Sequence, residues 1–195
     1  MTAPLAVICL SFFTVLTAYA AAPPQSSDDL DRVMQLLSTR RHGETSFIEQ
    51  RFLTLLKKPA ESSGELIYDA PDRLEKRTLQ PRPESLRVEG NLVTVQRGHR
   101  TRVIELSSYP QALPFVESIR ATLAGDRARL EKIFRVDFTG STVRWTLVLA
   151  PLDARVAQAV AQVQIDGVRD NLLRVEIRQP DGDRSLMTLR AHPDP

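Results

Sequence analysis

Cysteine is nearly missing from this 195-residue chain, in which Cys9 is the single example. Cys9 lies in an apolar N-terminal segment that we expect to be cut off, so the mature chain would have no thiol. A disulfide framework, a cysteine nucleophile and a thiolate metal site are therefore excluded together. Lipid attachment at Cys9 is disfavoured because Ile8 precedes it, where the processing peptidase needs a small residue.

Net charge is nearly missing as well. The 26 Lys and Arg residues face 24 Asp and Glu residues, which gives a formal charge of +2. The chain therefore lacks the strongly basic balance that dominates affinity for nucleic acids, and we expect no DNA or RNA partner.

The sequence also lacks catalytic and metal-binding motifs. Its three histidines are His42, His99 and His192, and none has a second ligand at helical metal spacing. No serine lies in a G-x-S-x-G motif, the glycines form no phosphate-binding loop, and Asp181 and Asp183 lie in turn-like sequence. We expect a protein with no metal, no cofactor and no enzymatic activity. A hydrolase that depends on one carboxylate or one histidine is the enzymatic alternative.

The N-terminal segment has no charged residue before Asp28. Leu5–Leu16 is an apolar run shorter than the roughly 20 residues that span a bilayer core. Ala18-Tyr19-Ala20 then fits the small-x-small rule of signal peptidase, which favours export to the periplasm and cleavage after Ala20 over a retained anchor. The predicted organisation is a signal peptide over residues 1–20, a flexible leader over 21–27 and a single domain over 28–195.

Two segments have the apolar spacing of helices. The first, over residues 28–40, has apolar residues at i, i+3, i+4 and i+7, with acidic residues at its start and basic residues at its end. The second, between Pro110 and Gly125, gathers its apolar residues on one face and leaves Glu117, Arg120 and Thr122 off it. Each helix should cover a sheet, either as ordinary core packing or as a lid over a cavity.

Most of the remaining chain alternates between apolar and polar residues, which is typical of strands with one buried face. Glycine-containing pairs mark the expected hairpin turns: Gly90-Asn91, Gly98-His99, Asp166-Gly167 and Asp181-Gly182. The pattern predicts ten or eleven strands and two main helices, an α+β fold with one large antiparallel sheet. A sheet of that many strands tends to curl.

Three short motifs follow the first helix: Phe47-Ile48-Glu49-Gln50, Ser63-Gly64-Glu65-Leu66-Ile67-Tyr68 and Pro71-Asp72-Arg73-Leu74. In this order they resemble the F-x-x-Q motif, the Gly-led strand and the Pro turn of the LolA-like outer-membrane lipoprotein carriers. The resemblance extends over nearly all of the expected mature chain. It implies an incomplete β-barrel, a curved antiparallel sheet whose concave apolar face is covered by helices and receives acyl chains.

The resemblance also implies a function and partners. Such carriers take cargo from an inner-membrane exporter and pass it to an outer-membrane acceptor without a cofactor, and we expect this chain to act as a monomer. Removing acyl chains from water requires an apolar surface, since each CH₂ is worth about 0.8 kcal/mol. The candidate residues of the lipid-binding cavity are Tyr68, Leu74, Phe138, Trp145 and Leu147, and the candidate lid contacts are Phe115 and Ile119.

One residue departs from the family pattern. Glu75 occupies the position at which the carriers have an arginine that holds the lid closed by hydrogen bonds to backbone carbonyls. We therefore leave two cargo classes open, a lipoprotein or a glycolipid such as an aryl polyene lipid. A periplasmic sensor or interaction module with a filled core is the alternative function, because apolar alternation is identical for a cavity wall and for a core.

Overall fold

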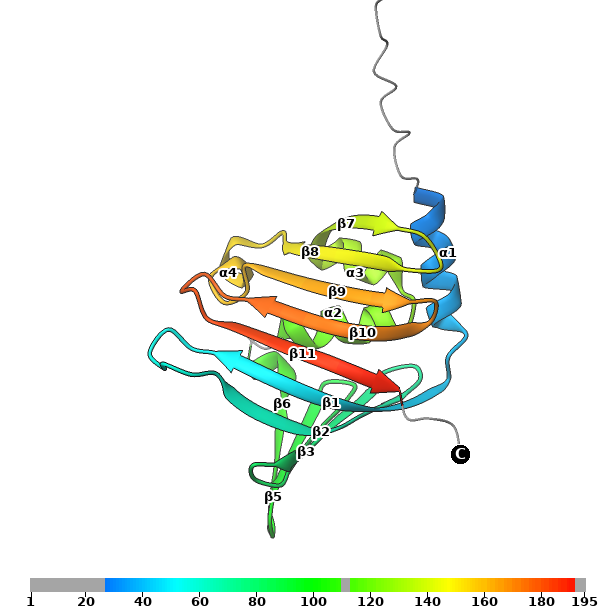
Figure 1. Cartoon of the computed structure of the whole chain (residues 1–195). Helices are drawn as coiled ribbons and strands as arrows, with labels where there is room; N and C mark the ends of the chain where they lie inside the picture. The colour runs from blue at the N-terminus through cyan, green and yellow to red at the C-terminus, as the bar shows by residue number, and fades with distance from the viewer. Residues whose placement is uncertain (1–26, 110–112, 192–195) are drawn as a thin grey trace, which may run out of the picture.

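The alternating segments form one antiparallel sheet of eleven strands in the order β6-β5-β4-β3-β2-β1-β11-β10-β9-β8-β7 (Figure 1). The computed structural model describes residues 27–109 and 113–191. The expected signal peptide and residues 21–26 of the expected leader lie outside the described residues. The strands are β1 His42–Phe52, β2 Ala60–Asp69, β3 Arg73–Gln80, β4 Glu84–Glu89, β5 Leu92–Arg97, β6 Arg100–Glu105, β7 Phe134–Gly140, β8 Trp145–Pro151, β9 Gln162–Val168, β10 Asn171–Arg178 and β11 Arg184–Ala191.

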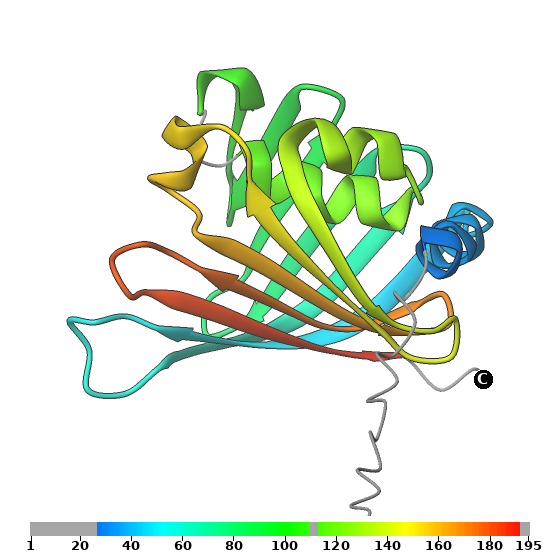
Figure 2. The ribbon, with the colours of Figure 1, turned by 90° about the horizontal axis from the view of Figure 1, so that it is seen from above.

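The sheet curls and is not closed, since β6 and β7 are its two edges. α2 and α3 lie over its concave side, and α1 lies across one end of the strands (Figure 1, Figure 2). This confirms the expected α+β class with a curved antiparallel sheet and covering helices. The helices are α1 Ser27–Ser38, the 3-10 turn η1 Leu106–Ser108, α2 Leu113–Leu123, α3 Arg127–Ile133 and α4 Ala154–Ala157. None of these described helices combines the length and the apolar character needed to cross a membrane.

The predicted apolar stripe of α1 is buried in full, at Leu30, Val33, Met34 and Leu37. The last turn of α1 meets the turn between α2 and α3 closely. Gly125 has a φ of 64°, and a Cβ there would lie 2.0 Å from the carbonyl oxygen of Met34. Only glycine fits this approach, which ties the N-terminal helix to the helices over the sheet.

Three of the four predicted glycine turns are confirmed, including Asp181-Gly182 between β10 and β11, where Gly182 has a φ of 92°. Gly90 and Gly98 have a φ of 56° in two-residue hairpins, as expected. The turn predicted at Asp166-Gly167 is wrong, because β9 continues to Val168. Gly167 faces the Trp145 ring, where a Cβ would lie 2.1 Å from Cζ2. This glycine therefore makes room for a side chain and does not turn the chain.

The concave face contains two apolar clusters. The main cluster joins α1, α2 and α3 to both sides of the sheet and includes Phe47, Leu66, Tyr68, Ile119, Leu130, Phe134, Trp145, Leu147, Leu149, Val163, Ile165, Val175 and Leu189. The second cluster lies under the β4–β6 end of the sheet and consists of Val88, Val93, Leu106 and Val116, with half-buried residues around it. Phe115 packs against both clusters.

Candidate functional site

The five candidate cavity residues come together on the concave face. Tyr68, Trp145 and Leu147 are members of the main cluster, and Leu147 is completely buried. Leu74 and Phe138 are half-buried and pack against the same cluster. The indole Nε1 of Trp145 also donates a hydrogen bond to the carbonyl oxygen of Arg169 at 2.8 Å. In this conformation these side chains pack against buried neighbours from the helices.

The two candidate lid contacts lie on α2, which is buried on all sides. Ile119 belongs to the main cluster, while half-buried Phe115 reaches the edge of the apolar interior. Glu117, Arg120 and Thr122 lie off the apolar face by sequence pattern, yet they are buried too. α2 is therefore an internal helix that packs against α1 and α3.

Two open cavities border the N-terminal end of α2. The larger one, called the mouth cavity here, has a volume of about 670 Å³, and its neighbour has about 550 Å³. Both volumes are within the usual range for small-molecule sites. The two share Gln158 and Ala159. Apolar residues of the mouth cavity are Leu53, Phe115, Ala159, Val160 and Ile177, and those of its neighbour are Leu113, Pro114, Ile133 and Val156.

The wall of the mouth cavity contains one buried carboxylate, that of Glu49. It forms an ion pair with Lys76 and accepts hydrogen bonds from Ser185 Oγ at 2.6 Å and Ser62 Oγ at 3.3 Å. Burial alone would raise the pKa of Glu49, but the charge and hydrogen bond of Lys76 lower it below its ordinary value. The Lys76 ammonium group also lies 5.0 Å from the centre of the Phe47 ring. The site thus combines an apolar surface with one fixed ion pair.

Arg120 joins α2 to two turns in the β2–β5 part of the sheet. Its guanidinium group forms an ion pair with Asp72 at 2.9 Å and donates a hydrogen bond to the carbonyl oxygen of Gly90 at 2.9 Å. Glu117 forms an ion pair with the same guanidinium group at 3.2 Å and a second ion pair with Arg129 at 2.5 Å. A buried arginine on the helix therefore connects α2 to the turns after β2 and β4. We call this set of contacts the Arg120 latch.

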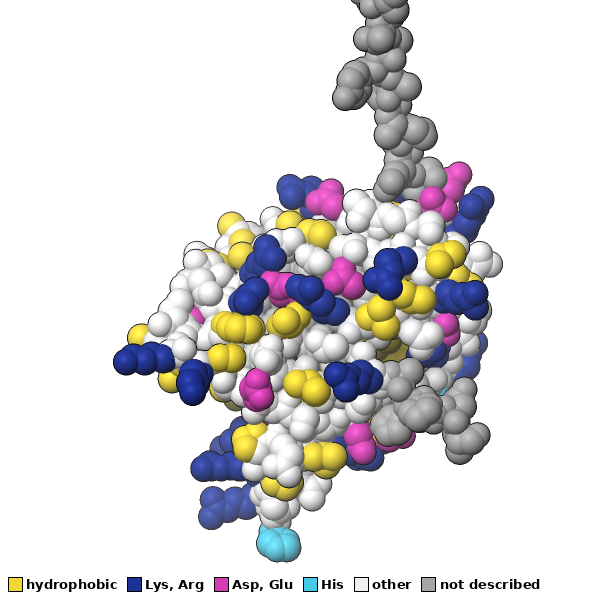
Figure 3. Space-filling model, viewed as in Figure 1, with side chains coloured by type: hydrophobic (Ala, Val, Ile, Leu, Met, Phe, Trp, Pro, Cys, Tyr) yellow, Lys and Arg dark blue, Asp and Glu magenta, His cyan; other side chains and the backbone are white. Residues whose placement is uncertain are grey.

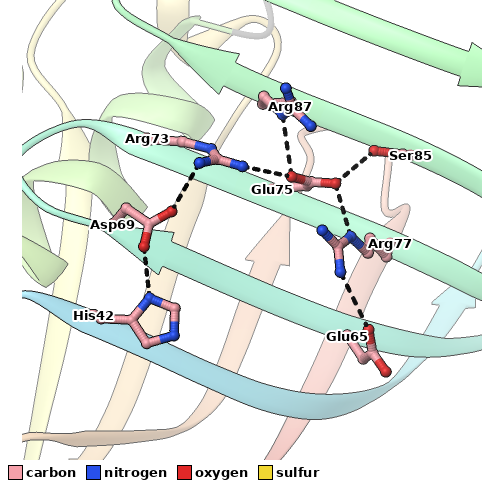
Figure 4. A network of polar contacts seen from close by, with 8 residues as sticks. All are labelled: His42, Glu65, Asp69, Arg73, Glu75, Arg77, Ser85 and Arg87. Carbon is pink, nitrogen blue, oxygen red and sulfur yellow. Dashed lines mark hydrogen bonds and ion pairs between the residues drawn. The ribbon is translucent and has the colours of Figure 1, made fainter.

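Glu75 points away from the helices, to the convex face (Figure 4). Its side chain is 3% exposed, its carboxylate is surrounded by Arg73, Arg77 and Arg87, and Ser85 donates a hydrogen bond to it at 3.0 Å. Burial raises the pKa of Glu75, but hydrogen bonds from Arg77, Ser85 and Arg87 outweigh it and lower the pKa to about 2. On the opposite, concave side, Arg120 of the helix donates a hydrogen bond to a backbone carbonyl, that of Gly90.

A second glutamate on the convex face has the same surroundings. Glu176 on β10 is flanked on its own strand by Arg174 and Arg178, and Arg184 approaches from β11 at 3.6 Å. Its pKa is lowered because hydrogen bonds from Arg178 and Arg174 outweigh the opposite effect of burial. We call these two groups of side chains, one around Glu75 and one around Glu176, the arginine clasps. Sequence reasoning missed them, although R-x-E-x-R at residues 73–77 and 174–178 places all three side chains of each on one face of a strand.

The described residues contain no group of three or more His, Cys, Asp and Glu side chains that could hold a metal ion. His42 pairs with Asp69 at 2.5 Å on the exposed side of the sheet, and His99 lies in the turn between β5 and β6. His192 lies outside the described residues.

Residues 21–192 match the model of a family described as outer membrane lipoprotein carrier protein LolA-like. No curated protein sequence matches this chain. Among solved structures, a LolA superfamily protein from Nitrosomonas europaea is similar at 9% identity and a TM-score of 0.44, over 86% of this chain and 94% of that one.

Two further solved structures are similar at a comparable level. Lipoprotein LppX from Mycobacterium tuberculosis has 11% identity and a TM-score of 0.44, over 87% of this chain and 99% of that one. MucB in the MucA/MucB complex of Pseudomonas aeruginosa has 14% identity and a TM-score of 0.45, over 86% of this chain and 58% of that one.

Proposed function

The chain belongs to the LolA-like family of outer membrane lipoprotein carrier proteins, and from this premise we propose that it is a periplasmic carrier of acyl-chain cargo. Proteins of this family are binding and carrier proteins that act outside the cytoplasm. The proposed carrier takes a lipoprotein or a glycolipid from an inner-membrane exporter to an outer-membrane acceptor. It works as a monomer without a cofactor.

The observation that carries this proposal is the pair of open cavities beside the N-terminal end of α2. Their apolar walls lead toward the main cluster through Phe115, which packs against that cluster and lines the mouth cavity. An acyl chain could enter there and lose contact with water, which is favourable by about 0.8 kcal/mol per buried CH₂. The ion pair of Glu49 and Lys76 would then lie beside the part of the chain nearest the polar head of the cargo.

The two open cavities lie beside one end of α2, and α2 itself occupies the space in front of the curved sheet. In the proposed cycle, α2 is displaced when cargo enters, and Phe115 and Ile119 give up their contacts with the interior. Tyr68, Leu74, Phe138, Trp145 and Leu147 then form the wall against which the acyl chains pack. The Arg120 latch adds to the free energy of this displacement, because it joins α2 to Asp72 and Gly90.

Mass spectrometry of organic extracts from the purified exported protein tests the proposal. The unchanged protein should release an acyl lipid. Ala159→Phe should reduce this release, because Ala159 lines both cavities and a phenyl ring would project into the wall that they share. Ala154→Phe is the matched control, since Ala154 is exposed on α4, the short helix that ends just before Ala159, and is not among the lining residues. Absence of lipid from the unchanged protein, together with no binding of an added fluorescent fatty acid, would refute the carrier function.

A specific observation favours a second candidate, an interaction module that carries no lipid. The interior behind the mouth is filled, with Trp145 and Leu147 at 1% and 0% exposure. In that function the two cavities would receive side chains of a partner protein. The same extraction experiment separates the candidates, because an interaction module would be recovered lipid-free and with a stable protein partner.

A further inference from the structure

The loop between β1 and β2 exposes two leucines to solvent. Leu55 is 95% exposed and Leu56 is 51% exposed. Burying one leucine side chain stabilises a protein by about 1.5 to 3 kcal/mol, so a loop that holds two of them in water forgoes a sizeable gain. The residues that follow are Lys57 and Lys58, both exposed. We call residues 53–59 the Leu-Lys loop.

The base of the Leu-Lys loop is held in place by hydrogen bonds. The backbone N–H of Leu56 donates to the carbonyl oxygen of Leu53 at 2.8 Å, which closes a turn. The backbone N–H of Thr54 donates to the Asp183 carboxylate at 2.8 Å, which fixes the loop to the turn between β10 and β11. The loop therefore projects from the sheet with its leucines outward, as the leftmost part of the molecule in Figure 1.

The same end of the molecule bears unpaired positive charge. Among the described residues, Lys57 and Lys58 have no ion-pair partner. The neighbouring carboxylates of Asp181 and Asp183 accept hydrogen bonds from backbone N–H groups. Figure 3 shows basic and hydrophobic side chains next to one another at this end. The loop thus combines an aliphatic tip with two cations.

The loop also forms part of the rim of the mouth cavity. Leu53 at its base and Asp183, which holds it, both line that cavity. Exposed Leu152 and Arg155 lie just after β8, which ends at the same side of the sheet. A surface that receives the loop would therefore lie close to the opening of the cavity.

We propose that the Leu-Lys loop docks the protein onto the surface of an anionic lipid bilayer. Leu55 and Leu56 enter the boundary between headgroups and acyl chains, while Lys57 and Lys58 contact lipid phosphates. An acidic partner protein would match the lysines but supplies no apolar layer for both leucines. The docking rests on the proposed carrier function for its purpose, because it brings the mouth to the membrane that gives or accepts the cargo, but its test does not require cargo.

A second basic region provides an internal comparison. The hairpin of β5 and β6 exposes Arg100 and Arg102, which also have no ion-pair partner among the described residues. Its turn consists of Gly98 and His99 and has no aliphatic side chain. Removal of two positive charges from this hairpin changes the net charge as much as their removal from the Leu-Lys loop.

Flotation of the purified exported protein with vesicles tests the docking. The unchanged protein should bind vesicles of phosphatidylcholine and phosphatidylglycerol in equal parts and should bind pure phosphatidylcholine weakly. Lys57→Gln with Lys58→Gln should weaken binding about fivefold for each lysine, and Leu55→Ser with Leu56→Ser about tenfold for each leucine that enters the interface. The matched controls, Arg100→Gln with Arg102→Gln and exposed Val143→Ser, should bind as the unchanged protein does.

Several results would overturn the docking. They are no binding by the unchanged protein, equal binding to both kinds of vesicle, undiminished binding by either loop variant, and an equal loss in the arginine control. Binding of the loop to an acidic protein alone would appear as the first of these. Lipid extraction from the loop variants tests the carrier function separately from membrane docking. Variants that retain cargo but not docking support both proposals, whereas loop-dependent flotation of a protein without cargo contradicts only the carrier function.

Discussion

The two halves of the curved sheet are built differently on their concave face. In the half formed by β7–β11, the face is packed into the main cluster, with Trp145, Leu147 and Val163 almost or completely buried. In the half formed by β2–β6, the distal strands contribute buried Val88 and Val93 to a smaller cluster, around which Leu86, Val95 and Ile104 are half-buried. There α2 joins the cluster through Val116 and is also connected through the Arg120 latch.

The convex face has the same kind of charged cluster in both halves. Each half has one arginine clasp, around Glu75 in β3 and around Glu176 in β10. The convex contacts are therefore alike in the two halves, and the difference between the halves lies on the concave face. Polar contacts can be exchanged for water at a smaller cost than a packed apolar surface, so we expect α2 to open away from the β2–β6 half.

The strongest test of this difference is a truncation in each cluster. Leu147→Ala should lower the free energy of unfolding by about 3 kcal/mol, because it leaves a cavity in a cluster that cannot collapse. Val163→Ala and Val88→Ala remove the same two methyl groups from sites of 0% and 1% exposure. We expect a loss of about 2.5 kcal/mol at Val163 and about 1.5 kcal/mol at Val88, where fewer neighbours are lost. Urea unfolding measures both, and equal losses would contradict the comparison.

Removal of the latch should affect one half only. Arg120→Met should lower stability by about 2 kcal/mol, since Glu117 keeps Arg129 and Asp72 can reach water. Hydrogen exchange should become faster in α2 and in the turn at Gly90, and should stay unchanged in β8–β10. Arg120→Lys should restore part of the protection because it keeps the charge. Uniform acceleration over the whole sheet would mean that the latch is an ordinary core contact.

Protonation of Glu75 at low pH should lower the stability that the arginine clasp of the β2–β6 half provides. The folded-state pKa of Glu75 is about 2, below the ordinary value of 4.5. Its contribution to stability is therefore complete above pH 4.5 and is lost as the pH falls toward 2. After allowance for the half-exposed arginines, we expect roughly 2 kcal/mol. Unfolding of the unchanged protein and of Glu75→Gln as a function of pH measures it, and identical curves below pH 4.5 would rule the contribution out.

Most of the fold could be predicted from the sequence because its signals are local. Alternation with a period of two marks strands that bury one face, and the stripe of α1 has the helical period. The turn at Asp166-Gly167 failed because the role of Gly167 depends on Trp145, which comes from another strand. A glycine beside an aspartate looks the same in sequence whether it turns the chain or admits an indole ring.

The candidate site could be predicted only in part. The apolar residues of the sheet do come together, because alternation fixes which face they share. The open cavities depend on Gln158 and Ala159 and on the turn after β10, and these segments have no apolar period. Arg120 was assigned to the polar face of its helix, and its burial follows from Asp72 and Gly90, which lie far away in the sequence. Long-range partners of this kind leave no trace in local spacing.

The smallest expected effect is a change in the pKa of Glu75 or Glu176 when one arginine is removed from its clasp. Arg77 donates to Glu75 at 2.8 Å, and Arg178 donates to Glu176 at 2.9 Å, from half-exposed side chains in both cases. Arg77→Gln should raise the pKa of Glu75, and Arg178→Gln should raise that of Glu176, because each change removes a charged donor from a buried carboxylate. Overall stability at neutral pH should change little, since two arginines remain around each glutamate. Carboxyl titration by NMR gives the pKa values. Similar increases would show that the clasps are equivalent although the concave faces behind them differ, whereas an increase confined to Glu75 would mean that Arg174 and Arg184 keep the pKa of Glu176 low without Arg178.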